Sequence, residues 1–219
     1  MTWLDANRAY VLDMLVQHVR LSVPAIAVSV LVAIVLGRIA WRWPRAGTVV
    51  LGTASLLYSV PALPLLIVIP VLLGIPLRSG LTLVVALAVY GTALLASTAA
   101  DAFRSVDARV REAAEAMGYS RSGLFWKVDL PLAVPVLAVV GLLSFIGTIN
   151  EYIIASALIQ TPSTKTLAVG LQGFISNQYA ENWGPFAAGA LLAAIPVVIL
   201  FLFLQKFIVS GLTAGSVKG

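Results

Sequence analysis

Five long apolar stretches, separated by short polar segments, constrain the fold of this chain more than any other feature of its sequence. A helix that crosses the hydrocarbon core of a membrane needs about 20 mostly apolar residues, and each stretch is long enough. The sequence therefore predicts an all-α integral membrane protein, with residues 1–219 forming a single domain built on a five-helix bundle. The expected spans are at about residues 21–41, 48–73, 81–100, 131–158 and 185–204.

The composition excludes an ordinary soluble domain. Of the 219 residues, 60% are hydrophobic and 11% are charged, whereas a soluble domain carries about 25% charged residues. The chain has no cysteine and a single histidine, so disulfides, thiolate metal sites and a zinc ligand set are not expected. The histidine, His18, is expected to be a hydrated residue near the outer surface, and no metal is predicted.

Two of the expected spans carry signals of helix packing. The second contains Pro61, Pro64 and Pro70, and membrane helices tolerate such prolines where neighbouring helices satisfy the freed carbonyls. We therefore expect this span to be kinked and packed inside the bundle. The third span is rich in small residues, which let membrane helices approach closely. They are Ala86, Ala88, Gly91, Ala93, Ala96, Ala99 and Ala100.

Lysine and arginine are distributed unequally between the two sides that the spans define. Ten lie on one side and four on the other, and positive residues accumulate in cytoplasmic loops. The amino terminus is therefore expected outside and the carboxyl terminus in the cytoplasm. This bias explains the net charge of +5, so no nucleic-acid partner is expected. The ten are Arg38, Arg42, Arg45, Arg104, Arg109, Arg111, Arg121, Lys127, Lys206 and Lys218, and the four are Arg8, Arg20, Arg78 and Lys165.

The amino-terminal residues 1–20 have apolar side chains near helical spacing. They are expected to form an amphipathic helix that lies at the outer surface of the membrane.

Residues 101–130 form a polar insert between the third and fourth spans and are expected in the cytoplasm. Its first part is rich in Ala and Glu, which favour a helix, and Gly118 can supply a left-handed stop. Ser120 can cap a second short helix, and Pro131 suits the first turn of the next span. A helix, a sharp turn and an amphipathic helix of this kind fit a groove on a soluble partner.

The insert resembles the EAA motif of type I ABC-importer permeases. That motif reads Glu-Ala-Ala, three residues, Gly, nine residues, a branched aliphatic residue, one residue and Leu-Pro. Every fixed position matches, with Val in place of the commoner Ile, although a plain connecting loop is the alternative interpretation. The matching residues are Glu112, Ala113, Ala114, Gly118, Val128, Leu130 and Pro131.

The resemblance implies a permease subunit in a bacterial inner membrane. In that family the first short helix of the motif is a coupling helix that docks in a cleft of an ATP-hydrolysing subunit. The implied partners are two ATPase subunits, a second permease copy or homologue, and an extracytoplasmic solute-binding protein. The chain has no G-x-x-x-x-G-K-[ST] phosphate loop. It is therefore expected to be no enzyme itself and to bind no cofactor, with ATP bound by the partner subunits.

The substrate implied by the resemblance differs along the chain. Residues 1–130 are similar to permeases for glycine betaine, choline or carnitine, as in LLYSVPALPLL, whereas residues 131–219 are similar to maltose-type sugar permeases, as in LSFIGTINEYIIASALI. Whether this mosaic is natural or engineered is left open. We favour a quaternary-ammonium osmoprotectant on the amino-terminal likeness, with a sugar as the alternative. A membrane scaffold that transports nothing is the alternative from another class.

Asn150, Glu151 and Tyr152 are candidates for lining the translocation path. Glu151 is the one carboxylate inside an expected span, and an ionisable group in the membrane normally faces a cavity or a partner. The alternative is a hydrated position at the outer interface. Aromatic rings could also bind a quaternary ammonium through cation–π contact, although packing is the commoner role. The aromatic candidates are Tyr58, Tyr90, Phe145 and Tyr152.

The expected outer loop, residues 160–184, offers candidates for an outer gate or a contact with the solute-binding protein. They are Gln172, Asn177 and Trp183. An ordinary surface loop is equally consistent with the sequence.

Overall fold

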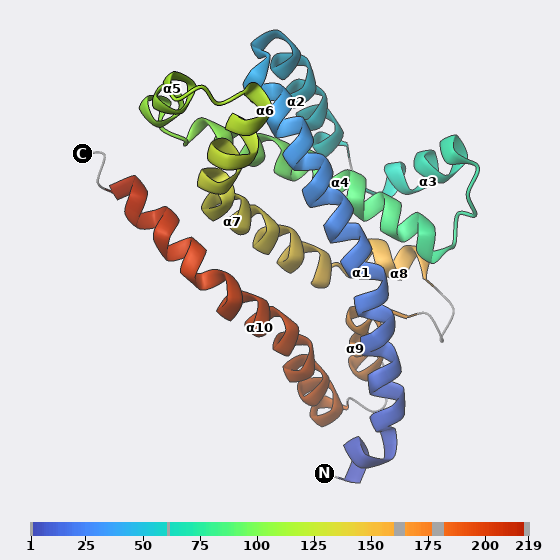
Figure 1. The fold of residues 1–219 in the computed structure, drawn as a ribbon. Coiled ribbons are helices and arrows are strands. Elements are labelled where there is room, and N and C mark those ends of the chain that lie inside the picture. The colour runs from blue at the N-terminus through green and yellow to red at the C-terminus, as the bar shows by residue number, and fades with distance from the viewer. Residues whose placement is uncertain (1, 61, 160–164, 177–181, 217–219) are drawn as a thin grey trace.

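The computed structural model describes residues 2–60, 62–159, 165–176 and 182–216, and all regular structure within these residues is helical. Four of the described helical segments are long and apolar enough to cross a membrane. The expectation of an all-α membrane protein is thus confirmed (Figure 1). The elements are α1 Thr2–Arg42, α2 Pro44–Ser59, α3 Ala62–Leu73, α4 Gly80–Arg104, α5 Ala108–Ala116, α6 Arg121–Leu124, the π-helix η1 Phe125–Asp129, α7 Leu130–Ile149, α8 Ile153–Leu158, α9 Leu167–Ile175 and α10 Trp183–Ser216.

The second expected span, residues 48–73, is two helices rather than one kinked helix. The helix α2 ends at Ser59, and its cap residue Val60 is extended, with φ −72° and ψ 128°. A residue that precedes proline is pushed out of the helical region by the proline ring, and Val60 precedes Pro61. The helices α2 and α3 have 16 and 12 residues, so neither alone reaches the length of a full span.

The first twenty residues do not form a separate surface helix, because α1 runs unbroken for 41 residues. Within it, Pro24 is accommodated without a break. His18 is buried, with 3% of its surface exposed, and this differs from the hydrated position expected of it. Between Met14 and Ala40 the helix buries one face, at helical spacing. That face contains Met14, His18, Ser22, Ala25, Ser29, Ala33 and Ala40.

The fourth span is shorter than expected at its far end. The helix α7 stops at Ile149, and Asn150 and Glu151 turn the chain into the short helix α8. The region expected as a fourth span, residues 131–158, is therefore one span followed by a separate turn of helix. At its other end α7 continues directly from α6 and η1.

The centre of the molecule is the close contact between α1 and α4. A Cβ atom added at Gly37 would lie 2.7 Å from the backbone nitrogen of Ala100 and from the Cβ of Ala99, so only glycine allows this approach. The small residues of the third expected span are indeed used for packing, since Ala96, Ala99 and Ala100 are fully buried. A hydrogen bond of 3.0 Å between the hydroxyls of Ser29 and Ser144 adds α7 to this pair.

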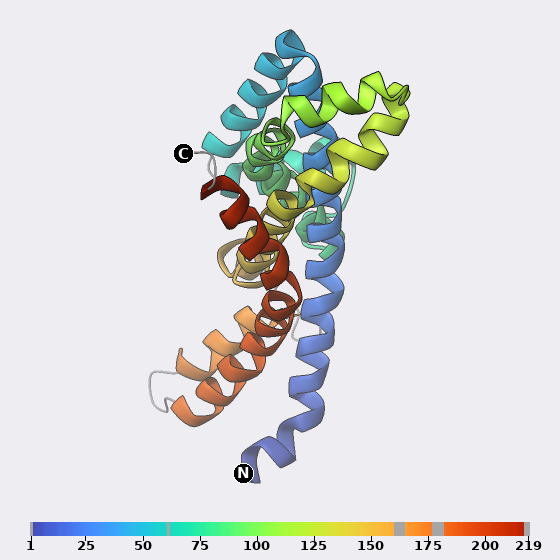
Figure 2. The same ribbon diagram turned by 60° about the vertical axis from the view of Figure 1, so that its left-hand side comes forward.

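The two ends of the molecule carry different elements. Figures 1 and 2 show α5 and α6 at one end, with α9 and the starts of α1 and α10 at the other. At that second end a small core of Met14, Leu167 and Leu171 joins α1 to α9, with Phe186 of α10 packed against it. Among the four described spans, Trp183–Phe207 of α10 is the least buried, and α10 packs on α7 and α9.

Gly37→Ala is expected to destabilise the protein, because the added methyl group meets the backbone of α4. Overpacking of a tight contact costs about 1–3 kcal/mol, so the thermal unfolding midpoint in detergent should fall. Gly141→Ala in α7 is the matched control, since a Cβ there meets no atom within 4 Å. Equal unfolding midpoints for the two variants would contradict the close packing.

Candidate functional site

The first half of the insert folds as the helix α5 followed by a left-handed turn. The carboxylate of Asp107 caps α5 by accepting a hydrogen bond of 2.9 Å from the N–H of Arg109. At the other end Gly118 has φ +86°, a conformation that favours glycine. The N–H of Gly118 donates to the carbonyl of Glu115 at 2.9 Å, and that of Tyr119 donates to Ala114 at 3.2 Å. These two bonds make a Schellman cap, so the left-handed stop expected at Gly118 is present.

The second half of the insert joins directly onto the span α7. The hydroxyl of Ser120 accepts a hydrogen bond of 3.1 Å from the N–H of Gly123 and caps α6, as expected. The chain then widens into one π-helical turn, η1, before Leu130. Pro131 has no N–H to continue a regular helical ladder, and a π-turn just before it absorbs the irregularity.

The residues of the motif occupy different environments. Glu112, Ala113, Gly118 and Pro131 are exposed, and Leu130 is half-buried, while Ala114 is 2% exposed and lies on the face of α5 that packs on α6 and η1. The outward face of the turn therefore combines acidic and apolar side chains. Sequence reasoning did not single out the exposed apolar residues of α5 and its turn, which are Val110, Met117 and Tyr119.

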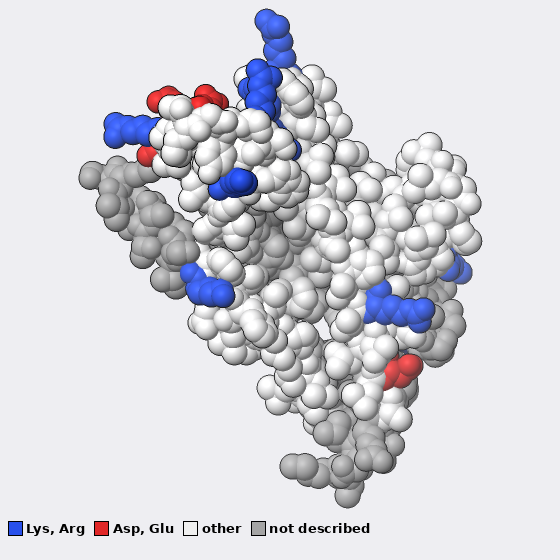
Figure 3. Space-filling view, in the orientation of Figure 1, with Lys and Arg blue, Asp and Glu red and all other residues white. Residues whose placement is uncertain are grey.

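Charged side chains gather at the end of the molecule that carries α5. Figure 3 shows acidic and basic groups together over α5 and its neighbours, and mostly uncharged surface along the middle of this face. A cap of charged groups next to an uncharged belt is the pattern of a helical bundle that emerges from lipid into water. The turn at Gly118 therefore lies outside the apolar belt, where a soluble partner can reach it.

A buried ion pair fastens α5 to η1. The Nε–H of Arg111 donates to the Oδ1 of Asp129 at 2.8 Å, and the side chain of Asp129 is only 4% exposed. The guanidinium carbon of Arg111 also lies 4.5 Å from the centre of the Trp41 ring, at the end of α1. Sequence reasoning missed this pair because its partners are 18 positions apart. The available signal was a lone aspartate directly before the apolar run that begins at Leu130.

Aromatic rings extend this ion pair into a cluster that joins four elements. Phe103, at the end of α4, is fully buried, and its ring centre lies 6.0 Å from those of Trp41 and Phe125. The guanidinium carbon of Arg38 lies 3.4 Å from the centre of the Phe125 ring. Cations over aromatic faces attract the ring quadrupole most strongly where water is excluded. We call Arg38, Trp41, Phe103, Arg111, Phe125 and Asp129 the interface cluster.

Asn150, Glu151 and Tyr152 lie together at the opposite end of α7. Both carboxylate oxygens of Glu151 accept backbone hydrogen bonds, from Ile154 at 2.7 Å and from Ala155 at 2.9 Å. Glu151 thus caps the start of α8, where a negative charge is favoured by the helix dipole. Tyr152 is 39% exposed beside it. Glu151 therefore has a defined structural partner, which the sequence did not predict.

The outer candidates are only partly described by the structure. Gln172 is exposed on α9, and Trp183 begins α10, where its ring packs edge-on against Phe186 with centroids 6.0 Å apart. Asn177 lies outside the described residues.

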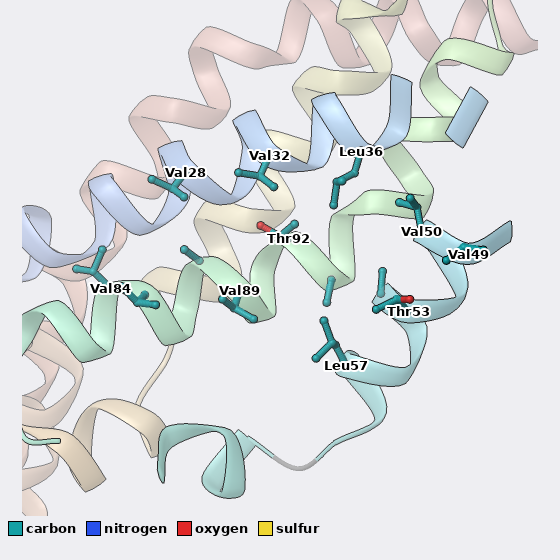
Figure 4. A pocket seen from close by; sticks show the side chains of 14 residues that line it. Val28, Val32, Leu36, Val49, Val50, Thr53, Leu57, Val84, Val89 and Thr92 are labelled. Atoms are coloured by element: carbon teal, nitrogen blue, oxygen red, sulfur yellow. The ribbon is translucent and has the colours of Figure 1, made fainter. Parts of the chain in front are cut away.

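An apolar cavity of about 490 Å³ opens between α1, α2 and α4. Figure 4 shows Val28 and Val32 of α1, Leu57 of α2 and Val89 of α4 around it, with Thr53 and Thr92 supplying the hydroxyl groups among its lining side chains. A polar solute needs several convergent hydrogen-bonding groups. This cavity is therefore not a good candidate for a polar-solute site.

Comparison with known proteins identifies the family. Residues 29–213 match the family model described as binding-protein-dependent transport system inner membrane component. The chain belongs to this family. The matched range contains α5 with its turn at Gly118, the interface cluster and the turn at Glu151. The resemblance to ABC-importer permeases drawn from the EAA motif is confirmed. Members of this family are components of transport systems. That description agrees with the expectation of a permease subunit.

Individual relatives of this inner membrane component are maltose-type permeases. This chain is 47% identical over 129 residues to a maltose/maltodextrin transport system permease protein MalG of Photorhabdus laumondii. The match covers 59% of this chain and 43% of the relative. It is 45% identical over 117 residues to the maltodextrin transport system permease protein MdxG of Bacillus subtilis, covering 53% and 42%. The chain thus spans less than half the length of these relatives.

A solved structure shows the same fold. It is described as the crystal structure of a bacterial ABC transporter involved in the import of the acidic polysaccharide alginate. The similarity has a TM-score of 0.56 and 21% sequence identity, and it covers 92% of this inner membrane component and 72% of the other chain.

Gly118→Val is expected to open the turn after α5 without a steric clash, because an added Cβ meets no atom within 4 Å. A β-branched residue in the left-handed region costs roughly 1–2 kcal/mol. The rate of trypsin cleavage after Arg121 in the purified inner membrane component should therefore rise by about 5- to 30-fold. Gly118→Asn is the control, because asparagine tolerates this conformation. A valine variant as resistant as the asparagine variant would argue against the strained turn.

Proposed function

We propose that this chain is a translocation subunit of an ABC importer and that ATP is hydrolysed by partner subunits. The observation that carries the proposal is the exposed helix–turn at α5 and Gly118, which contains the Glu-Ala-Ala and Gly positions of the EAA motif at one end of a membrane bundle. Membership of the inner membrane component family supports it. Closure of the ATPases on ATP pushes α5, rocks the bundle and opens the path outward, and hydrolysis reverses the motion.

The partners of this subunit follow from the same proposal. Two ATPase subunits receive coupling helices, a second permease copy or homologue completes the path, and an extracytoplasmic binding protein delivers the solute. The exposed surface of α5 and its turn suits a cleft of mixed apolar and basic character. Met117, the cap residue of α5, is 71% exposed, and Glu112 and Glu115 of the same helix are exposed as well. Apolar anchors surrounded by charged groups are the usual composition of such docking surfaces.

We place the α5 end in the cytoplasm of a bacterial cell, with the amino terminus outside and the carboxyl terminus inside. The charged groups gathered at this end support that orientation (Figure 3). Gln172, Asn177 and Trp183 then belong to the outer side, where we propose that they contact the binding protein or form the outer gate.

The proposed substrate is a maltodextrin-type sugar rather than a quaternary-ammonium osmoprotectant. The relatives named above are maltose and maltodextrin permeases. The match of 129 residues is longer than residues 131–219, so it reaches into the part that carried the osmoprotectant likeness. The rings of Tyr58 and Tyr90 have centroids 5.2 Å apart, which leaves no space for a cation between them. The earlier preference for an osmoprotectant is therefore replaced by its alternative.

Uptake by a reconstituted complex tests the substrate and the transport class together. The chain should co-purify with ATPase subunits and accumulate labelled maltotriose in vesicles that contain ATP and receive a maltodextrin-binding protein. Labelled glycine betaine, offered with a betaine-binding protein, should not accumulate. The opposite preference would overturn the sugar proposal. Failure to retain ATPase subunits would favour the non-transporting scaffold.

We also propose that Asn150, Glu151 and Tyr152 line the path near its outer end. Glu151→Gln keeps one acceptor for the α8 cap and removes the charge, so it should raise the KM for sugar uptake by about tenfold if that charge also meets the solute. Glu151→Ala removes the whole cap and is the control for stability. A glutamine variant with an unchanged KM would reduce Glu151 to its capping role.

A further inference from the structure

We propose that Arg111 is a positioning residue that locks the coupling helix α5 onto the membrane-embedded helices through Asp129 and Trp41. The proposal rests on the function proposed above and identifies the contact that carries motion from the ATPase side into the bundle. Apart from this contact and the packing of Ala114 on α6 and η1, α5 is joined to the spans by the backbone at residues 105–107 and 117–120. With this contact, α5 moves together with α1 and with the start of α7.

The helix α5 has little apolar attachment of its own. Of its nine residues, Ala114 is the one that is buried. A helix held by one small apolar side chain can tilt freely on its neighbours, because most of the stability of a short helix comes from packing. Arg111 is half-buried on the same helix and reaches both η1 and α1. The orientation of α5 therefore depends on Arg111.

The ion pair differs from an ordinary surface pair on the same side of the molecule. Arg104 and Asp101 are also 2.8 Å apart, but their side chains are 53% and 64% exposed. The side chains of Arg111 and Asp129 are 19% and 4% exposed at the same distance. Water screens the first pair, whereas the second lies where an unpaired charge is strongly disfavoured. Separation of Arg111 from Asp129 is therefore resisted much more than separation of Arg104 from Asp101.

The Nη2 atom of Arg111 indicates that this residue serves to position α5 more than to stabilise the fold. Its Nη2 group is buried and has no hydrogen-bond partner in this structure. A buried donor without an acceptor is unfavourable, and native proteins retain few of them. The guanidinium group nevertheless contacts both Asp129 and the ring of Trp41, and these two contacts restrict its position. This arrangement favours a geometric role for Arg111.

The remaining members of the interface cluster attach this contact to rigid elements. Phe103 is fully buried between Trp41 and Phe125, and Arg38 lies over the Phe125 ring. The ends of α1 and α4 are themselves held together by the contact at Gly37. A displacement of α5 that acts through Arg111 is thus applied to a packed body rather than to a loop.

The first measurement follows the orientation of α5 and does not require transport. The chain has no cysteine, so spin labels can be placed at exposed Glu115 in α5 and exposed Val49 in α2 through engineered cysteines. The distance distribution should be narrow in the otherwise unaltered chain and broad in Arg111→Gln and Asp129→Asn. Arg104→Gln, in the exposed pair, is the matched control and should stay narrow. Narrow distributions in all variants would overturn the proposal.

The second measurement uses the complex with ATPase subunits and the maltodextrin-binding protein. Arg111→Gln and Asp129→Asn should assemble and hydrolyse ATP, while maltotriose transported per ATP falls by about 5- to 150-fold. Arg111→Lys keeps the charge but not the planar group that lies over Trp41, so it should recover part of the loss. Unchanged transport per ATP in all three variants would overturn the positioning role.

The two measurements separate this proposal from the function on which it rests. An unaltered complex that transports neither solute refutes the proposed function, and the spin-label distances alone then decide whether Arg111 holds α5. Unfolding midpoints of the variants are recorded as well. A variant that unfolds at a lower temperature than the unaltered chain is replaced in both measurements by Arg111→Lys. If Arg111→Lys shows a distance distribution as narrow as that of the unaltered chain and also full transport, the requirement for the planar guanidinium is overturned.

Discussion

The close approach of α1 and α4 is the contact on which the rest of the structure depends. Lipid is as apolar as the side chains of these helices, so their association relies on van der Waals packing of small residues rather than on a hydrophobic driving force. Gly37 lets the backbone of α4 come within contact distance. As a consequence, the rings of Trp41 at the end of α1 and Phe103 at the end of α4 pack against each other. Their rings provide the surface on which the polar insert is seated.

The insert is rigid because its local signals agree with one another. Asp107 and Ser120 cap two helices, and Gly118 closes the turn between them with a Schellman cap. These elements are short and polar, so they hold their shape by hydrogen bonds rather than by a core of their own. Their attachment to the spans then comes from η1, which turns the buried carboxylate of Asp129 toward Arg111. Local hydrogen bonding and a single buried ion pair thus act together.

The features that could be predicted from the sequence are those that neighbouring residues determine. The apolar stretches, the left-handed glycine and the cap at Ser120 were all predicted because each depends on a few consecutive residues. The Arg111–Asp129 pair depends on how two elements fold back on each other, and the burial of His18 depends on how other elements pack against α1. The break after Val60 was expected only as a kink, although a residue before proline is a common helix end. The osmoprotectant preference rested on similarity along the amino-terminal part of the chain, whereas the relatives favour the sugar alternative.

The length of α7 explains how events at the two ends of the molecule can be related in the proposed importer. Its 20 residues span about 30 Å, from the ion pair at Asp129 to the turn capped by Glu151. A hydrogen bond between Ser29 and Ser144 joins α7 to α1, and α7 also packs on α4, so α7 is attached to the packed pair of α1 and α4. A rigid element fixed at one end to the coupling helix converts a small tilt there into a displacement at the other end. In this chain that far end carries Asn150, Glu151 and Tyr152, the same residues that the sequence marks as candidates for contact with the solute.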